Sequence, residues 1–292
     1  MILSVETNVL RDKYDDETAV RMIREAGFDA YDYSMFHAKG ERDMLGNDYV
    51  ERAYKLRKIA DEIGILCRQA HAPFDFEYTD ETDISNPRYL KLVRSLEVAS
   101  ILGAKNIVVH TVNKNLPKDF DLESFSRNFY KSFIPYCEKY NINISVENLV
   151  GIIPETKEKF PVFSDPVKHI EFVKSLNCEY FNICIDVGHS ALLGYMPENV
   201  IKSMDNKLFK TIHVHDNDFE RDSHVLPYEG KIDWEAVTSA LAKIKYDGDF
   251  SFELEGLFYR LDDALLPAGL KFAEATGRVL IDKIKKARNK LC

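Results

Sequence analysis

The stretch TIHVHDNDFERDSHVLPYEGKIDWEAV, Thr211–Val237, joins a short strand pattern to a loop rich in histidine and carboxylate side chains. His213 and His215 alternate with Ile212 and Val214, which is the two-residue period of a β-strand. A strand that ends by directing imidazoles into an acidic loop is an unusual way to fill a core. A bound metal ion would account for it.

A loop and a helix start follow this strand. Asp, Asn and Ser residues, then Pro227 and Gly230, are typical of a loop. Asp233 is typical of a helix cap before Trp234 and Val237. The stretch therefore predicts one strand–loop–helix unit, and the rest of the chain repeats that alternation.

Eight short apolar runs are predicted to be strands: Ile2–Val5, Phe28–Tyr33, Ile65–His71, Asn106–His110, Asn143–Glu147, Phe181–Asp186, Phe209–His215 and Phe250–Glu255. The longer amphipathic runs between and after them are predicted to be helices: Glu17–Ala26, Asp48–Ile63, Pro87–Leu102, Asp121–Tyr140, Val167–Leu176, Pro197–Met204, Trp234–Lys245 and Asp262–Arg288. Continuous apolar strands that alternate with helices indicate a parallel sheet, and eight repeats indicate a closed (β/α)8 TIM barrel.

The chain shows no linker and no break in composition, so we expect one domain over residues 1–292. The alternative is a doubly wound open sheet. Such a sheet would normally carry a glycine-rich dinucleotide loop after its first strand. The segment VETNVLRDK, Val5–Lys13, contains no glycine.

Composition narrows the class of protein. The 292 residues are 45% hydrophobic, and 39 Lys and Arg against 48 Asp and Glu give a net charge of −9. An acidic chain is not expected to bind nucleic acid through its overall field. The five cysteines form no CxxC pair, the amino terminus does not resemble a signal peptide, and no apolar run approaches the roughly 20 residues of a membrane helix. We expect a soluble cytoplasmic protein without membrane contact.

In barrels of this class the active site lies at the carboxyl ends of the strands. From the third predicted strand to the eighth, every end carries a side chain that can bind a metal: His71, His110, Glu147, Asp186 with His189, His213 and Glu253. Imidazole and carboxylate groups suit Zn²⁺, Mn²⁺ or Co²⁺, and the absence of cysteine argues against a closed structural zinc site.

Each of these residues also has a simpler interpretation. His71 and His110 could each bond a backbone carbonyl at a turn. Glu147 and Asp186 follow apolar runs, so their burial without a partner would cost several kcal/mol. Strand alternation does not choose between Glu253 and Glu255, because both would point the same way.

A resemblance rests on SVEN (Ser145–Asn148), IDVGH (Ile185–His189), HVHD (His213–Asp216), the run D-x-H-x-x-P-x-E-G-x-x-D-W over Asp222–Trp234, and Glu253. Together they resemble the xylose-isomerase-like barrels along the whole chain. This superfamily includes sugar and sugar-phosphate isomerases and epimerases, inosose dehydratase-like enzymes and, more distantly, endonuclease IV.

The resemblance implies one divalent ion (Mn, Zn, Co or Mg) held by Glu147, Asp186, His213 and Glu253. It further implies proton abstraction beside a carbonyl, with the metal stabilising the enediolate and Glu147 and Glu253 acting as acid and base. The other site residues are expected to contact substrate or hold the ligands in place: His71, His110, His189, His215, Asp222 and His224. Tyr228 departs from the pattern, because relatives usually have glycine there.

The expected substrate is a small sugar or polyol. The loop after the seventh strand is acidic, which weakly favours an unphosphorylated substrate. Aromatic residues near the strand ends could form an apolar wall facing the sugar, although about half are expected to be ordinary packing: Tyr33, Phe36, Phe74, Phe76, Trp234 and Phe258.

Three other functions stay open. Nine residues could supply the three-metal site of an endonuclease IV-like zinc phosphodiesterase: His71, His110, Glu147, Asp186, His189, His213, Asp222, His224 and Glu253. No basic stretch with interleaved aromatics supports a DNA surface. A dehydratase-type lyase and a non-catalytic sugar-binding barrel are the other two. The sequence leaves open the sugar, the native metal, the choice among isomerase, epimerase and lyase, and whether the chain forms a homo-oligomer.

Overall fold

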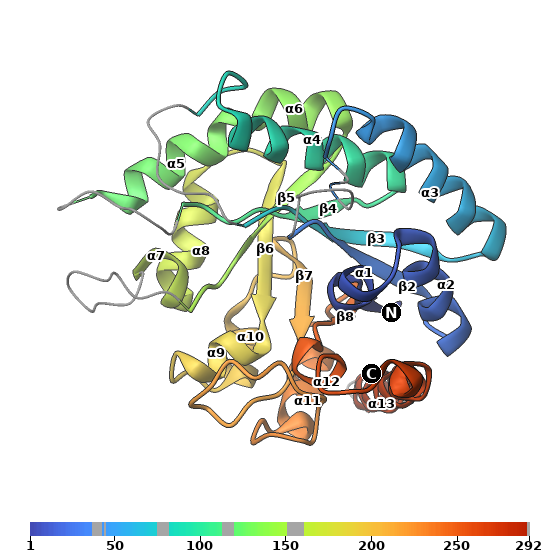
Figure 1. Cartoon of the computed structure of the whole chain (residues 1–292). Helices are drawn as coiled ribbons and strands as arrows, with labels where there is room; N and C mark the ends of the chain where they lie inside the picture. Colours follow the sequence, from blue (N-terminus) through green and yellow to red (C-terminus); the bar gives the residue numbers. More distant parts are fainter. Residues whose placement is uncertain (37–42, 44, 75–81, 113–119, 151–160, 291–292) are drawn as a thin grey trace.

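Eight parallel strands form a closed barrel in chain order, with the first strand pairing to the last (Figure 1). A computed structural model describes residues 1–36, 43, 45–74, 82–112, 120–150 and 161–290. The strands are β1 (Leu3–Glu6), β2 (Ala30–Ser34), β3 (Leu66–His71), β4 (Asn106–Val108), β5 (Asn143–Glu147), β6 (Phe181–Asp186), β7 (Phe209–Val214) and β8 (Phe250–Phe252). The predicted TIM barrel is confirmed, and the open doubly wound sheet is excluded.

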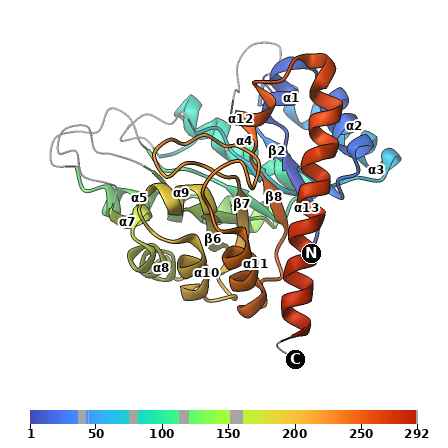
Figure 2. The same cartoon turned by 90° about the horizontal axis from the view of Figure 1, so that it is seen from below.

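Helices surround this barrel (Figure 1). They are α1 (Asn8–Lys13), α2 (Asp16–Ala26), α3 (Tyr49–Ile63), α4 (Pro87–Leu102), α5 (Leu122–Ser132), α6 (Ile134–Tyr140), α7 (Pro161–Ser164), α8 (Pro166–Ser175), α9 (Val187–Leu192), α10 (Pro197–Ser203), α11 (Trp234–Lys243), α12 (Glu255–Phe258) and α13 (Leu266–Asn289). The long helix α13 packs against α2 and α11 and so closes the outer ring (Figure 2). None of the described helices is long and apolar enough to cross a membrane.

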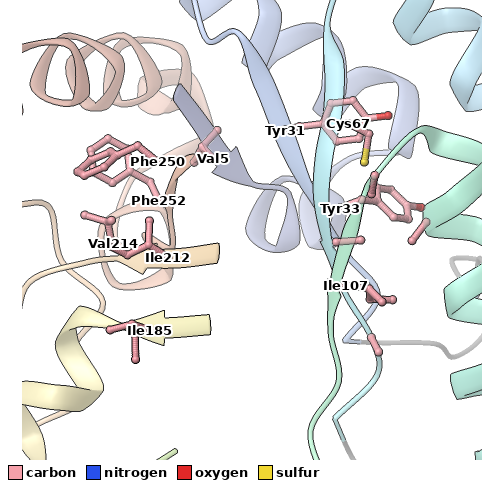
Figure 3. Close-up of a cluster of buried hydrophobic side chains, with 14 of the residues drawn as sticks. Val5, Tyr31, Tyr33, Cys67, Ile107, Ile185, Ile212, Val214, Phe250 and Phe252 are labelled. Carbon is pink, nitrogen blue, oxygen red and sulfur yellow. The ribbon is translucent and has the colours of Figure 1, made fainter. Parts of the chain in front are cut away.

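The strands are apolar on one face only. Their outward side chains form the core between barrel and helices, among them Val5, Tyr31, Ile107, Ile212 and Phe252 (Figure 3). Their inward side chains are mostly polar and fully buried, among them Ser4, Asp32, Gln69, Ser145, Thr211 and Ser251. The prediction of continuously apolar strands is therefore wrong. Apolar and polar side chains alternate along the strands, because one face packs on the helices and the other lines a polar barrel interior. Such alternation is more usual in a sheet with one face exposed to solvent.

Hydrogen bonds between side chains satisfy part of this polar interior. Ser145 Oγ donates to Asn182 Oδ1 over 2.6 Å, and Asn182 Nδ2 donates to Asn106 Oδ1 over 2.8 Å. Buried polar groups without such partners would each cost free energy, so the interior is held together by specific bonds between strands β4, β5 and β6.

Several predicted boundaries differ from the structure. Strand β4 ends at Val108 and β8 at Phe252, so His110 and Glu253 lie just past their strands. The predicted helix Asp121–Tyr140 is broken at Phe133 into α5 and α6. Pro135 explains the break, because its ring lacks an N–H and clashes with a preceding turn of helix.

The helix cap predicted at Asp233 is confirmed, and Asp165 caps a second helix in the same way. Asp233 Oδ1 accepts a hydrogen bond of 3.0 Å from the backbone N–H of Ala236, which fixes the start of α11. Asp165 Oδ1 accepts one of 2.9 Å from the N–H of Val167, with Pro166 in the first turn of α8. The closing helix starts later than predicted, at Leu266, after a short 3₁₀ turn over Asp263–Leu265.

Candidate metal centre and active site

The four predicted metal ligands converge at the carboxyl end of the barrel. Glu147 ends β5, Asp186 ends β6, His213 lies in β7, and Glu253 follows β8. One ligand atom from each lies within 4.8 Å of the others, and all four side chains are buried. His213 Nδ1 stands between two carboxylates, 3.2 Å from Glu147 Oε1 and 3.1 Å from Glu253 Oε1.

The chemistry of this group fits a divalent cation. In the described part of the chain, no lysine or arginine forms an ion pair with Glu147, Asp186 or Glu253. Glu253 Oε1 and His213 Nε2 are buried, and neither has a hydrogen-bond partner among the residues that the structure describes. Buried carboxylates need a compensating charge, and oxygen with imidazole ligands suits Zn²⁺ or Mn²⁺.

The two glutamates differ in electrostatic environment. Burial favours the protonated form of Glu147, but the charge of His213 and hydrogen bonds from His110 and His189 hold its pKa well below the usual value. Burial, with Glu255 and Glu147 nearby, raises the pKa of Glu253 well above the usual value, against the opposing charge of His213. The two carboxylates therefore differ in proton affinity.

His71 and His110 lie on the other side of Glu147. His110 Nε2 is 2.6 Å from Glu147 Oε2, and His71 Nε2 is 3.6 Å from the same atom. His71 Nδ1 donates to the carbonyl of Ala72 over 3.1 Å, and burial lowers the pKa of His71 to about 4. The neutral ring therefore turns an unprotonated Nε2 toward a carboxylate. The three side chains form a second donor group able to hold a cation.

His189 is placed by the turn that follows β6. Asp186 caps helix α9, because its Oδ1 accepts a hydrogen bond of 2.6 Å from the backbone N–H of His189. His189 Nδ1 donates to the carbonyl of Asn148 over 2.9 Å, and its Nε2 lies 3.4 Å from Asp222 Oδ2. The side chain therefore links the end of β5 to the loop after β7.

A third donor group is completed by that loop. His224 Nε2 lies 3.3 Å from Asp222 Oδ1, and His215 Nε2 lies 3.0 Å from Asp186 Oδ1. One ligand atom from each of His189, His215, Asp222 and His224 falls within 4.8 Å of the others. All ten predicted site residues thus gather at one end of the barrel.

Asp216 holds the loop that carries His224. Its fully buried carboxylate accepts four hydrogen bonds, from the N–H groups of Asn217 (2.8 Å), Tyr228 (3.0 Å) and Ile232 (3.1 Å), and from Trp234 Nε1 (2.8 Å). Tyr228, the departure from the family pattern, keeps a left-handed backbone with φ of 80°. That conformation is uncommon for a bulky residue, so the bond from its N–H to Asp216 helps to impose it.

Replacing Asp216 by Ala should lower the free energy of unfolding by roughly 3 kcal/mol or more, because buried donors lose a charged acceptor. Chemical denaturation would measure this. Asp218→Ala is the matched control: it lies in the same loop and also accepts backbone N–H bonds, but it is partly exposed and its partner Arg221 is exposed, so its loss should cost much less than that of Asp216. Equal losses in the two variants would contradict the role given to Asp216.

Two buried carboxylates near the site were not predicted. Glu6 ends β1, and burial together with Glu255 and Glu253 raises its pKa well above the usual value. The sequence SVET around Glu6 parallels SVEN around Glu147, which is the signal that could have identified it. Asp32, inside β2, had no comparable signal.

Aromatic residues line one side of the site. The rings of Phe36 and Phe74 are 4.7 Å apart, and Phe36 lies 4.4 Å from the ring of His71. Trp234 instead donates a hydrogen bond to Asp216, and the Tyr33 hydroxyl donates one to Asp16. Phe258 is buried in the core, and Phe76 lies outside the described residues.

The model of the xylose isomerase-like TIM-barrel family matches residues 20–274 of this chain. The chain belongs to this family. The resemblance seen in SVEN, IDVGH and HVHD is thereby confirmed. Among curated relatives, the uncharacterized protein y4fM of Sinorhizobium fredii is 26% identical over 258 residues, covering 80% of this chain and 78% of y4fM. The uncharacterized protein MJ1311 of Methanocaldococcus jannaschii is 28% identical over 196 residues, covering 63% and 62%.

Solved structures of the xylose isomerase-like fold match nearly the whole chain. A D-tagatose 3-epimerase-like protein superposes with a TM-score of 0.75 at 20% identity over 100% of both chains. The IOLI protein with a bound zinc atom superposes with a TM-score of 0.76 at 20% identity, over 98% of this chain and 99% of that protein. D-psicose 3-epimerase from Clostridium cellulolyticum, with D-tagatose, gives 0.73 at 14% identity, covering 96% and 99%. At these identities the likeness shows the shared fold.

Proposed function

We propose that this protein is a divalent-metal-dependent sugar isomerase or epimerase that moves a proton at the carbon next to a carbonyl. One observation carries the proposal: two buried glutamates from different strands, Glu147 and Glu253, flank His213 Nδ1 within a four-residue donor group. Family membership, and neighbours described as sugar epimerases, support the same reading.

Glu147, Asp186, His213 and Glu253 would hold the ion, which when bound acts as a Lewis acid on a carbonyl and its neighbouring hydroxyl. Of these two glutamates, one can remove the substrate proton and the other can return it. Because they approach from β5 and from the end of β8, they can act on opposite sides of a substrate between them.

The surroundings favour an uncharged polyhydroxy substrate. Imidazole and carboxylate groups from His189, Asp222 and His224 can bond hydroxyls, while Phe36 and Phe74 offer an apolar face. Among the described residues no lysine or arginine contacts the four ligands, so phosphate would find little attraction there.

Deuterium exchange tests the proposal. Purified protein with Mn²⁺ and a panel of ketoses and aldoses in deuterated water should convert an active sugar and place deuterium on the carbon next to the carbonyl. The label would be read by NMR and mass spectrometry. Conversion without any deuterium would indicate a hydride shift or shielded transfer, and would contradict the two-carboxylate mechanism. A product lighter than the substrate by one water would identify the lyase alternative, which begins with the same proton abstraction.

A second function is favoured by a specific observation: among the described residues, four overlapping groups of side chains could each hold a metal ion, and three of them lie side by side. Two of these groups flank the four-ligand group. The first, His71–His110–Glu147, shares Glu147 with it, and the second, His189–His215–Asp222–His224, adjoins it through the contact of His215 with Asp186. Three zinc ions at these groups would suit phosphodiester hydrolysis, as in an endonuclease IV-like enzyme. Cleavage of DNA that contains an abasic site is the assay that separates the two functions.

A further inference from the structure

Asp32 is a buried carboxylate inside the barrel to which the proposed reaction gives no role. It lies in β2 and is fully buried. Its Oδ2 accepts hydrogen bonds from Gln69 Nε2 and, over 3.3 Å, from Ser251 Oγ, while its Oδ1 has no partner in the described part of the chain. Burying a carboxylate is costly unless a positive group compensates. The one ion pair that Asp32 forms among the described residues is with His213 Nε2, at 3.9 Å.

His213 shows the complementary deficiency. Its Nδ1 faces the carboxylates of Glu147 and Glu253, at 3.2 and 3.1 Å. Its Nε2 points the other way, toward Asp32, and is buried without a hydrogen-bond partner. A neutral imidazole carries one proton, so a ring that binds a cation through Nδ1 must keep its proton on Nε2. That N–H then requires an acceptor inside the barrel.

We propose that Asp32 is a positioning residue for His213. Asp32 accepts the Nε2 proton once the 3.9 Å between its Oδ2 and His213 Nε2 shortens to hydrogen-bond distance. It thereby fixes the ring so that the Nδ1 lone pair faces Glu147 and Glu253, and raises the basicity of the ligand. Ligand histidines commonly hold their second nitrogen against a carboxylate in this way. The inference rests on the proposed metal site but adds a residue from a strand, β2, that contributes none of the four ligands.

Besides Asp32, Glu147 and Glu253, two more titratable groups of the described residues face the ring of His213: His71, which stacks on it with ring centroids 5.7 Å apart and so offers no acceptor to Nε2 in the ring plane, and Cys184. Burial raises the pKa of its thiol to about 11, so it stays a thiol, which is a weak acceptor. Asp32 is therefore the stronger acceptor available to the Nε2 proton. The neighbouring interior groups Gln69 and Ser251 already donate to Asp32 and hold it in place.

Metal affinity gives the first test. The dissociation constant for Zn²⁺ would be measured by competition with a chromophoric chelator for the full chain and for Asp32→Asn, which keeps the shape but removes the charge. We expect binding to weaken roughly 10- to 100-fold, as for other groups behind a metal ligand. Ser145→Ala is the matched control, since it removes a buried interior hydrogen bond, to Asn182, without contacting His213. Its affinity should stay within about threefold of the unmodified protein.

The outcomes separate this inference from the proposed function. If the unmodified protein binds no Zn²⁺, the metal site itself is wrong. If it binds Zn²⁺ and Asp32→Asn binds equally well, the metal site stands and the role of Asp32 is wrong. If Ser145→Ala weakens binding as much, the effect is general loosening of the interior, which also contradicts the role.

Nitrogen NMR of the unmodified protein gives a test that needs no stable variant. With ¹⁵N-labelled histidine and Zn²⁺ bound, the His213 signals should show Nε2 protonated and Nδ1 bound to metal. The signals would be assigned within the unmodified protein, by through-bond correlations from the backbone of His213 to its ring. A proton on Nδ1, with Nε2 bound to the metal, would contradict the inference whether or not the Asp32→Asn chain folds.

Discussion

Glu147→Gln and Glu253→Gln should each lower the turnover number by roughly 10²-fold or more, in line with the contribution of general acid–base groups. Glutamine keeps the shape and one oxygen of the side chain but does not accept the substrate proton. Because the two residues lie on different strands, one variant can still exchange deuterium into the substrate without completing turnover. Steady-state rates and label uptake with the sugar identified by the exchange assay would measure both effects.

The matched control for this experiment is Glu17→Gln. Glu17 forms a partly exposed pair with Arg21 on α2 and contacts no site residue. Its removal should leave the turnover number unchanged. Metal content would be measured in all three variants, so that loss of the ion is distinguished from loss of the base. Full turnover in both Glu147→Gln and Glu253→Gln would rule out the assigned acid and base.

Asp186→Asn and His213→Ala should lose the bound ion while keeping the barrel. Each removes one of four converging ligands, so the loss of affinity should exceed the roughly 10- to 100-fold typical of groups behind a ligand. Elemental analysis after gel filtration measures the ion, and circular dichroism checks the fold. Asp121→Asn, which alters an exposed cap of α5, serves as the control and should retain it. Retention in both ligand variants would show that other residues hold the metal.

The barrel could be predicted because its signal is repetitive. Eight alternations of short and long periodic segments survive errors of a few residues at any boundary, such as the early end of β8 at Phe252. The helix break at Phe133 was missed because a helical pattern continues on both sides of it. Pro135 was the residue that could have predicted the break. The polar interior was missed because a strand such as FNICID is apolar on average. Its polar residues become evident only when the two faces of the strand are considered separately.

The metal ligands could be predicted because parallel strands bring their carboxyl ends together, so six separate positions in the chain point to one place. Glu6 was missed although it directly follows the first predicted strand, Ile2–Val5, and Asp32 was missed because it lies in the middle of a strand. Glu253 and Glu255 looked equivalent in a strand. In the structure Glu255 opens α12 and lies 3.1 Å from His224, a contact that no strand pattern encodes.

The number of divalent ions bound per chain distinguishes a single-metal isomerase or epimerase from a three-metal phosphodiesterase. Elemental analysis of the purified protein, after removal of loosely held ions and reloading with Mn²⁺ or Zn²⁺, should find one tightly bound ion, held by Glu147, Asp186, His213 and Glu253. His71, His110, Asp222 and His224 should then be free to contact substrate. Three zinc ions per chain, together with cleavage of abasic DNA, would contradict the account and identify a phosphodiesterase.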